Sequence, residues 1–242
     1  LFPLVLVPCA CRMIKSEYEV DLLEKSMAEA EKILEKFILE IKPGISEKQL
    51  HHRLLGLTYE NNELEGPSFL PIIASGESGW GIHSYYTGRK LKSNDSVIID
   101  MGVKYEGYCS DITRTIFLGK PTSEMERVYK TVLAAQEAAE ATIKPGIYNH
   151  SADAAAREVI TQSGFGEYFS HGLGHSIGLN THEGPYLSYV KKRQILKENM
   201  TFTLEPGIYQ KNKFGIRIED VIVLNKTGCK NITSFRKEMI IL

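Results

Sequence analysis

The first regular pattern along the chain is a run of apolar residues at helical spacing between about residues 16 and 41. Charged residues fill the other face, which is typical of an amphipathic surface helix. The apolar face consists of Leu22, Leu23, Met27, Ala30, Ile33, Leu34, Phe37 and Ile38. Pro43-Gly44 predicts the helix stop, and Ser46 with Gln49 predicts a capping box for a second helix through Leu55.

Other apolar runs predict strands. Residues 96–100 (SVIID) predict a buried strand, and residues 111–118 (DITRTIFL) predict its returning partner after a turn at residues 104–107. A second long helix is predicted at about residues 123–143. From residue 171 onward the chain is rich in strand-like runs, among them MTFTLEPGIY and GIRIEDVIVL.

One pentapeptide occurs twice. IKPGI at residues 41–45 returns at residues 143–147, an offset of 102 residues, and both copies stand between a long predicted helix and a shorter one. KPG is a common helix stop, so a chance match is the alternative. The matching helical context favours a duplication. The sequence therefore predicts two similar α+β halves, joined into one domain with a site at their junction.

The domain is expected to span residues 13–242, because no low-complexity segment or long linker divides the chain. Residues 1–12 are apolar but shorter than the ~20 residues of a membrane span, and they predict a non-native or linker tail. Lysine plus arginine (29) nearly balances aspartate plus glutamate (30), which argues against binding to nucleic acid or acidic membranes. Four scattered cysteines favour a reducing, cytoplasmic location over a disulfide scaffold or a zinc ribbon.

Two aspartates lie at the ends of the predicted hairpin. Asp100 ends an apolar strand, where a charge is costly unless it is paired or binds a metal, and Asp111 opens the returning strand. The hairpin can bring the two carboxylates together, where they repel unless a cation or a shared proton lies between them. The alternative is a pair of solvated loop aspartates, and this segment alone does not exclude it.

Three further segments carry candidate chemistry. HGLGHSIGLNTHEGP (residues 171–185) holds three of the chain's seven histidines among glycines, which suits either a metal site or a flexible surface loop. Glu205 interrupts an apolar strand in TLEPGIY. In IRIED, period-two alternation places Arg217 and Glu219 on one face of a strand, where they could also form a simple ion pair.

Taken together and in this order, the segments resemble the M24 metallopeptidases, the family of methionine aminopeptidases, Xaa-Pro aminopeptidases and prolidases. That family's ligand order is Asp, Asp, His, Glu, Glu, and every position is filled here. The matching residues are Asp100 and Asp111 in the hairpin, His175 in a G-H-x-I-G motif, Glu205 in an E-P motif, and Glu219. The resemblance implies the α+β pita-bread fold, with pseudo-twofold duplicated halves around a curved antiparallel sheet.

The resemblance also implies two divalent metal ions. Four carboxylates and one imidazole favour Mn²⁺ or Co²⁺, with Fe²⁺ and Zn²⁺ as alternatives. Two such ions ~3.5–4 Å apart can generate a bridging hydroxide and polarise a peptide carbonyl. By resemblance Asp111 and Glu219 bridge the ions, Asp100 binds one ion, and His175 with Glu205 binds the other. Glu205 is also the implied proton shuttle.

Additional residues resemble the proline-specific branch of the family. His83 in GWGIHS resembles a substrate-side histidine, and His182 in NTHEGP resembles a histidine that contacts the peptide carbonyl or tetrahedral intermediate. His171, Tyr209 in EPGIY and Arg217 in GIRIED also resemble this branch, in which the arginine usually orients a glutamate. The implied substrate is a peptide with proline at the second position, and the implied assembly is a homodimer.

Prolidases and Xaa-Pro aminopeptidases normally carry an additional N-terminal domain, whereas the matched pattern here begins at about Met13. A methionine aminopeptidase, which lacks that domain, is therefore the alternative, together with a hydrolase of small amidines or amides on the same fold. An alternative of another class is a catalytically inactive peptide-binding module. Such relatives usually lose metal ligands, and this sequence retains all five.

Overall fold

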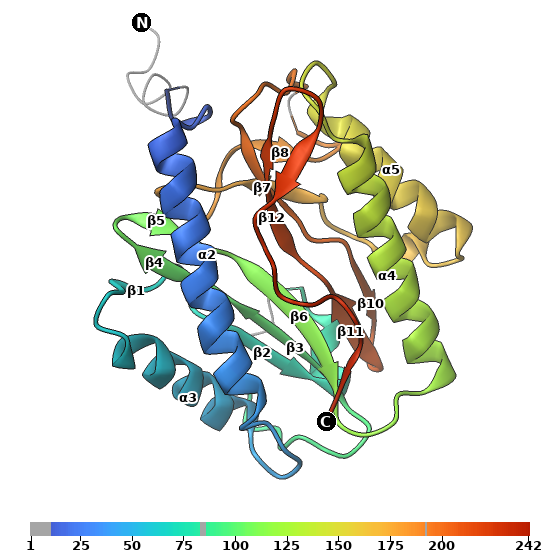
Figure 1. Ribbon diagram of the computed structural model, residues 1–242. Coiled ribbons are helices and arrows are strands. Elements are labelled where there is room, and N and C mark those ends of the chain that lie inside the picture. Colours follow the sequence, from blue (N-terminus) through green and yellow to red (C-terminus); the bar gives the residue numbers. More distant parts are fainter. Residues whose placement is uncertain (1–10, 83–85, 192) are drawn as a thin grey trace, which may run out of the picture.

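The computed structural model describes residues 11–82, 86–191 and 193–242, which Figure 1 traces from blue to red. The N-terminal half contains α2 (Glu17–Ile38), α3 (Glu47–Glu60), β1 (Gly66–Pro67), β2 (Ile72–Ser75), a 3₁₀ turn (Gly76–Trp80), β3 (Ser96–Met101), β4 (Val103–Tyr105), β5 (Tyr108–Cys109) and β6 (Ile112–Phe117). The C-terminal half contains α4 (Ser123–Thr142), α5 (Asn149–Gln162), a 3₁₀ turn (Gly166–Tyr168), β7 (Gly174–Ser176), β8 (Glu183–Leu187), β9 (Thr201–Leu204), β10 (Gly207–Gln210), β11 (Phe214–Arg217), β12 (Asp220–Leu224), β13 (Cys229–Asn231) and β14 (Ile240–Ile241). No helix within the described ranges is long and apolar enough to cross a membrane.

The capping box predicted at Ser46 is confirmed, and the structure adds a second one. Ser46 accepts a hydrogen bond from the backbone of Gln49, whose side chain accepts one from the backbone of Ser46, so two backbone donors at the start of α3 are satisfied. Ser16 caps α2 in the same way. Helix α3 runs to Glu60, beyond the predicted end at Leu55, because buried Leu57 extends its apolar face by another turn.

The predicted hairpin is confirmed in its long strands but is more elaborate at its tip. Strand β3 pairs antiparallel with β6, with Asp100 opposite Thr113. Between them the chain forms the short strands β4 and β5, which pair with each other. The turn itself is confined to Glu106 and Gly107, both with positive φ. Lys104 and Tyr105 therefore belong to a strand and not, as predicted, to the turn.

The two halves repeat each other in detail. Helices α3 and α5 occupy residues 47–60 and 149–162, which are separated by the 102-residue offset of the IKPGI repeat. Gly44 and Gly146 both adopt φ near 90°, a conformation that suits glycine. Each of these glycines donates a backbone hydrogen bond to a leucine after the helix pair, Gly44 to Leu91 and Gly146 to Leu196. The predicted duplication is confirmed.

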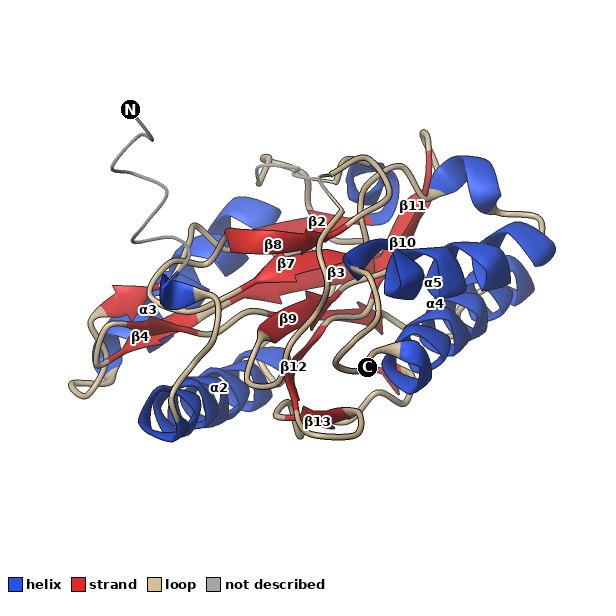
Figure 2. Ribbon diagram, turned by 90° about the horizontal axis from the view of Figure 1, so that it is seen from above, coloured by secondary structure: helices blue, strands red, loops and turns tan. Residues whose placement is uncertain are grey.

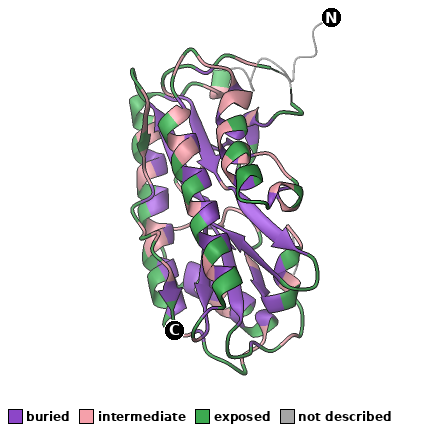
Figure 3. Cartoon of the chain, turned by 90° about the vertical axis from the view of Figure 1, so that its right-hand side faces the viewer, coloured by how far each residue is buried: buried purple, intermediate pink, exposed green. Residues whose placement is uncertain are grey.

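Each half has its own hydrophobic cluster. One lies beneath α2 and α3 and includes residues of β2, β3 and β6, and the other lies beneath α4 and α5 and includes residues of β9 to β12. Figure 2 shows α2, α4 and α5 along one face of the strands. Figure 3 shows the strands almost wholly buried and the helices exposed on their outer faces. This is the expected burial of an amphipathic helix on a sheet.

The sheets of the two halves meet at the strand β6. In the N-terminal half the strand order is β14-β6-β3-β2, and in the C-terminal half β13-β12-β9 and β10-β11 form separate ladders. Glu219, just before β12, donates its backbone N–H to the carbonyl of Thr113 in β6 at 3.1 Å. The hydroxyl of Thr115 donates to the carbonyl of Arg217 at 2.9 Å. The junction of the two halves therefore lies next to the predicted metal ligands.

Candidate metal centre

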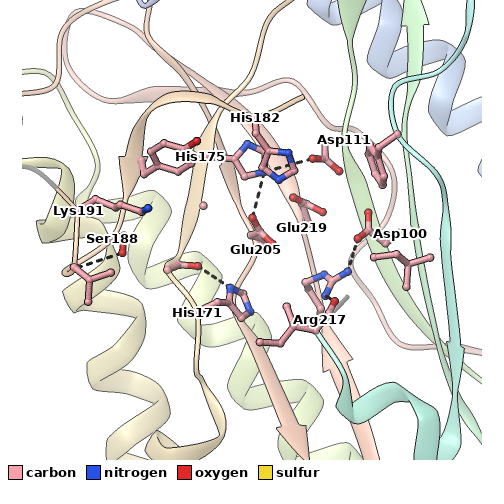
Figure 4. Close-up of a pocket in the computed structure, with 17 residues that line it drawn as sticks. Asp100, Asp111, His171, His175, His182, Ser188, Lys191, Glu205, Arg217 and Glu219 are labelled. Atoms are coloured by element: carbon pink, nitrogen blue, oxygen red, sulfur yellow. Dashed lines mark hydrogen bonds and ion pairs between the residues drawn. The ribbon is translucent and has the colours of Figure 1, made fainter. Parts of the chain in front are cut away.

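The five predicted ligands line one cavity of about 380 Å³, shown in Figure 4. Each comes from a different place in the sheets. Asp100 lies in β3, Asp111 just before β6, His175 in β7, Glu205 just after β9 and Glu219 just after β11. Asp100 and His175 lie in paired strands, Glu219 bridges to Thr113, and the Glu205 N–H donates to the carbonyl of Leu173 at 2.9 Å.

His175 is oriented as a neutral ligand. Its Nδ1 lies 3.1 Å from the carbonyl oxygen of Ser176, so Nδ1 carries the proton and Nε2 keeps its lone pair. Nε2 lies 3.6 Å from Asp111 Oδ2 and 3.4 Å from Glu205 Oε1. Burial, assisted by the neighbouring His182, lowers the pKa of His175 to about 3. The imidazole is therefore available to bind a metal ion at neutral pH.

Asp111, His175 and Glu219 form the tightest cluster, with one ligand atom of each within 4.8 Å of the others. Glu219 Oε2 accepts a hydrogen bond from Thr113 Oγ1 at 2.6 Å, whereas Glu219 Oε1 is buried and has no hydrogen-bond partner among the described residues. A buried carboxylate oxygen without a donor is costly, and a cation removes that cost. The residues therefore fit a metal ion.

The carboxylates together carry more negative charge than the protein alone stabilises. Burial, with repulsion from Glu219, raises the pKa of Asp111 well above its usual range, and burial raises the pKa of Glu219 likewise. Burial raises the pKa of Glu205 to about 8. Such carboxylates ionise at neutral pH only when cations are close. The donor set of four carboxylates and one imidazole suits divalent ions that prefer oxygen and nitrogen ligands.

Arg217 and Tyr209 connect Asp100 to His171. The Arg217 guanidinium donates to Asp100 Oδ2, and through Nη1 to the Tyr209 hydroxyl at 3.0 Å. The Tyr209 hydroxyl lies 3.0 Å from His171 Nε2. Because His171 Nδ1 lies 2.8 Å from the carbonyl of Gly172 and must donate to it, Nε2 accepts the tyrosine proton. The chain of donors runs from Arg217 through Tyr209 to His171.

Arg217 pairs directly with an aspartate, whereas the resemblance to the proline-specific branch implies that it orients a glutamate. The carboxylate in its ion pair is that of Asp100. The link to Glu219 is indirect, because Arg217 Nε donates to Thr113 Oγ1 at 3.1 Å and Thr113 in turn donates to Glu219. Arg217 lies at the end of β11 and across the seam from β6, which places Thr113 between the arginine and that glutamate.

His182 and His171 both line the cavity; Figure 4 shows His182 beside His175 and His171 on the side of Glu205 nearer to Arg217. The ring of His182 stacks at a tilt on that of His175, with centroids 4.1 Å apart. His182 is exposed to solvent, as expected for a group that meets a ligand. His83 lies outside the described residues.

Sequence analysis missed several residues of the site. Thr113 shares a face of β6 with Thr115, and the period-two pattern that begins at Asp111 in DITRT could have found it. The apolar and polar wall of the cavity carries no motif, and its residues come from distant segments. They are Phe69, Ile72, Ile82, Tyr186, Ser188, Val190 and Lys191.

Comparison with known proteins agrees with this geometry. The model of metallopeptidase family M24 matches residues 21–226. A Xaa-Pro dipeptidase from Pyrococcus horikoshii is 40% identical over 229 residues, which cover 95% of this chain and 65% of that protein. The chain thus spans about two thirds of the length of this curated relative. The match over residues 21–226 and this identity show that the chain belongs to metallopeptidase family M24.

Solved structures are similar over nearly the whole chain. A prolidase from Thermococcus sibiricus superimposes with a TM-score of 0.96 at 40% identity, covering 100% of this chain and 66% of that one. An X-Pro aminopeptidase from Thermotoga maritima gives a TM-score of 0.94 at 36% identity, covering 98% and 66%. The predicted pita-bread fold is confirmed.

Proposed function

We propose that this chain is the catalytic part of a peptidase that hydrolyses the bond between an N-terminal residue and proline. The observation that carries the proposal is the convergence of Asp100, Asp111, His175, Glu205 and Glu219 on one cavity, in a chain 40% identical to a Xaa-Pro dipeptidase. The similarity to an X-Pro aminopeptidase supports the same bond specificity.

These five residues would hold two divalent ions, with Asp111 and Glu219 between them. When bound, such ions supply Lewis-acid activation of water and of the scissile carbonyl. Mn²⁺ or Co²⁺ is the proposed native metal, because the donor set is rich in carboxylate oxygen. The Thr113 hydroxyl orients Glu219, and the Ser176 carbonyl orients His175.

The remaining steps belong to side chains of the chain itself. Glu205 accepts the proton of the attacking water and returns it to the proline nitrogen as the peptide bond breaks. With the metal ions bound, Glu205 is ionised and can accept this proton. His182, exposed at the cavity wall, donates to the oxygen of the tetrahedral intermediate. His171, Tyr209 and Arg217 fix the opposite wall and Asp100, and His83 is proposed to contact the substrate.

A panel assay tests this function. The protein is freed of metal with a chelator, reloaded with Mn²⁺ or Co²⁺, and given Xaa-Pro dipeptides, longer Xaa-Pro peptides and Met-Ala-Ser peptides. Hydrolysis of the proline-containing peptides is expected. Cleavage of Met-Ala-Ser peptides alone would replace the proposal with a methionine aminopeptidase, and metal binding without hydrolysis would favour an inactive peptide-binding module.

The proposal also includes a homodimer and a cytoplasmic location. The described cysteines Cys11, Cys109 and Cys229 are free thiols, which suits a reducing compartment. Sedimentation of the purified chain would measure its mass in solution, and a mass of two chains is expected.

A further inference from the structure

A buried lysine near the start of the described chain contacts strands β7 and β8, next to His175 and His182. Lys15, just before α2, is 2% exposed. Its amine donates to Ser176 Oγ at 3.3 Å and to Glu183 Oε2 at 3.3 Å. Ser176 follows His175 in β7, and Glu183 follows His182 at the start of β8.

The two partners of Lys15 are opposite each other in the β7–β8 ladder. Ser176 pairs with Glu183, and the six residues between them form the loop that ends at His182. The lysine amine therefore lies at the base of this loop. The backbone of Lys15 is itself fixed, because its N–H donates to the carbonyl of Asn199 at 2.8 Å.

Glu183 is held from several sides. Besides the Lys15 amine, its carboxylate accepts from Arg12 and from the backbone N–H of Asn180 at 3.1 Å. Space for the pair is provided by Gly178, where a Cβ would lie 2.9 Å from Glu183 Oε2 and 3.1 Å from Lys15 Cε. A glycine at position 178 therefore lets Lys15 and Glu183 approach each other closely.

The position of His182 depends on this arrangement. Its side chain is exposed and its ring contacts that of His175. The backbone that carries His182 is held on either side by a buried residue. Thr181 donates to the carbonyl of Ser68 at 3.0 Å, and Glu183 is held by Lys15.

We propose that Lys15 is a positioning residue, which holds the base of the 177–182 loop through Glu183 and Ser176 and so places His182 against the substrate. The inference rests on the proposed function, since His182 matters to catalysis only if the chain is a peptidase. It adds a residue outside the cavity, in the segment that leads into α2, to the groups that control the reaction.

The test uses two variants and one control. Lys15→Met removes the amine but keeps the length of the side chain. The double variant Lys15→Met/Glu183→Gln also removes the buried carboxylate charge, which Arg12 alone would otherwise balance, so it is expected to recover folding stability. Lys32→Met is the matched control, because Lys32 lies in α2 and pairs with Glu29 on the exposed surface.

Two readouts are compared. The first is the imidazole resonance of His182 in the metal-free protein, assigned by its loss in His182→Ala and recorded at one pH. The second is the split between kcat and KM of the metal-loaded protein on a Xaa-Pro substrate. Lys15→Met is expected to shift or broaden the His182 resonance and to lower kcat about tenfold at unchanged metal content and KM. The double variant should regain thermal stability but neither the resonance nor kcat.

Recovery of both stability and kcat in the double variant would overturn the proposal, because the pair would then serve only the fold. An unchanged His182 resonance in a folded Lys15→Met protein would overturn it as well. Failure of both variants to fold would assign the pair to the fold as a whole and equally contradict the proposal. Inactivity of the unchanged chain would refute the peptidase function, while the resonance would still decide whether Lys15 positions His182.

Discussion

Thr113 donates a hydrogen bond to Glu219 Oε2 at 2.6 Å, across the seam between the two halves of the fold. The same hydroxyl accepts from Arg217 Nε at 3.1 Å. One threonine thus orients the glutamate and anchors the arginine that holds Asp100. Thr113 belongs to the N-terminal half and both of its partners to the C-terminal half, so this part of the site forms only where the two halves meet.

Thr113→Val should weaken metal binding. The valine has nearly the same shape but no hydroxyl, so Glu219 Oε2 loses its donor and its orientation. Loss of such an outer partner typically lowers metal affinity about 10- to 100-fold. Calorimetric titration of the metal-free protein with Mn²⁺ measures the change. Thr113→Ser keeps the hydroxyl and is the control; an equal loss in both variants would contradict this role.

Asp111→Asn should abolish activity and reduce metal binding at both sites, because Asp111 is proposed to bridge the ions. The amide keeps the shape of the side chain but loses its charge and one acceptor oxygen. Metal content after dialysis, measured by elemental analysis, should fall well below that of the unchanged protein. Glu63→Gln, on the exposed surface, is the charge-matched control. Full activity of Asp111→Asn would show that the ligand assignment is wrong.

His182→Ala should lower kcat by about 10²- to 10³-fold, the usual cost of removing one donor to a developing oxyanion. Metal content should not change, because His182 is outside the proposed ligand set. Steady-state kinetics with parallel metal analysis measures both. A loss of metal together with activity would instead make His182 a ligand.

Tyr209→Phe should interrupt the donor chain between Arg217 and His171. Burial raises the pKa of Tyr209 to about 12, so the hydroxyl stays protonated and donates to His171 at all working pH values. Removing it deprives buried Arg217 and half-buried His171 of one hydrogen bond each, at a cost of about 1–3 kcal/mol of stability. Thermal unfolding and kcat/KM should both decline. An exposed tyrosine offers the control, Tyr59→Phe, which should change neither.

The metal-free protein should lose stability between pH 7 and pH 8.5. Burial raises the pKa of Glu205 in the folded state to about 8, so the folded protein retains a proton that the unfolded chain releases near its ordinary pKa of about 4.3. Stability from that proton is lost as pH rises through 8, by about 1 kcal/mol over this interval. His175 stays neutral in both states there, because its pKa of about 3 when folded and its ordinary value of about 6.5 both lie lower.

Chemical denaturation at the two pH values measures this effect. Glu205→Gln should reduce the pH dependence, and saturating Mn²⁺ should remove it because the bound ion keeps the carboxylate ionised. A metal-free protein that is equally stable at pH 7 and pH 8.5 would contradict the proposed burial of protonated carboxylates.

The sequence could predict the features that depend on short motifs or on the periodicity of neighbouring residues. The capping box at Ser46 and the β3–β6 hairpin depend on residues close together in the chain, and the IKPGI repeat is a direct match between two segments; the structure contains all three features. The alternation in IRIED placed Arg217 and Glu219 on the side of the strand that faces the cavity. Period-two geometry determines this without any long-range information.

The rest depends on contacts between distant segments. Arg217 meets Asp100 across 117 positions, and Lys15 meets Glu183 across 168. No spacing rule links such pairs, since their distance is set by how the sheets of the two halves meet. The pair of Arg217 with Asp100 was not predicted for this reason. The cavity wall from Phe69 to Lys191 was missed for the same reason.

The most direct test of the central claim is a joint measurement of metal stoichiometry and hydrolysis. Metal-free protein is titrated with Mn²⁺ or Co²⁺ while bound metal and cleavage of a Xaa-Pro dipeptide are followed in the same samples. The five-residue site predicts that activity rises with bound metal and levels off at two ions per chain. Saturation of binding without hydrolysis, or hydrolysis that persists in metal-free protein, would contradict it.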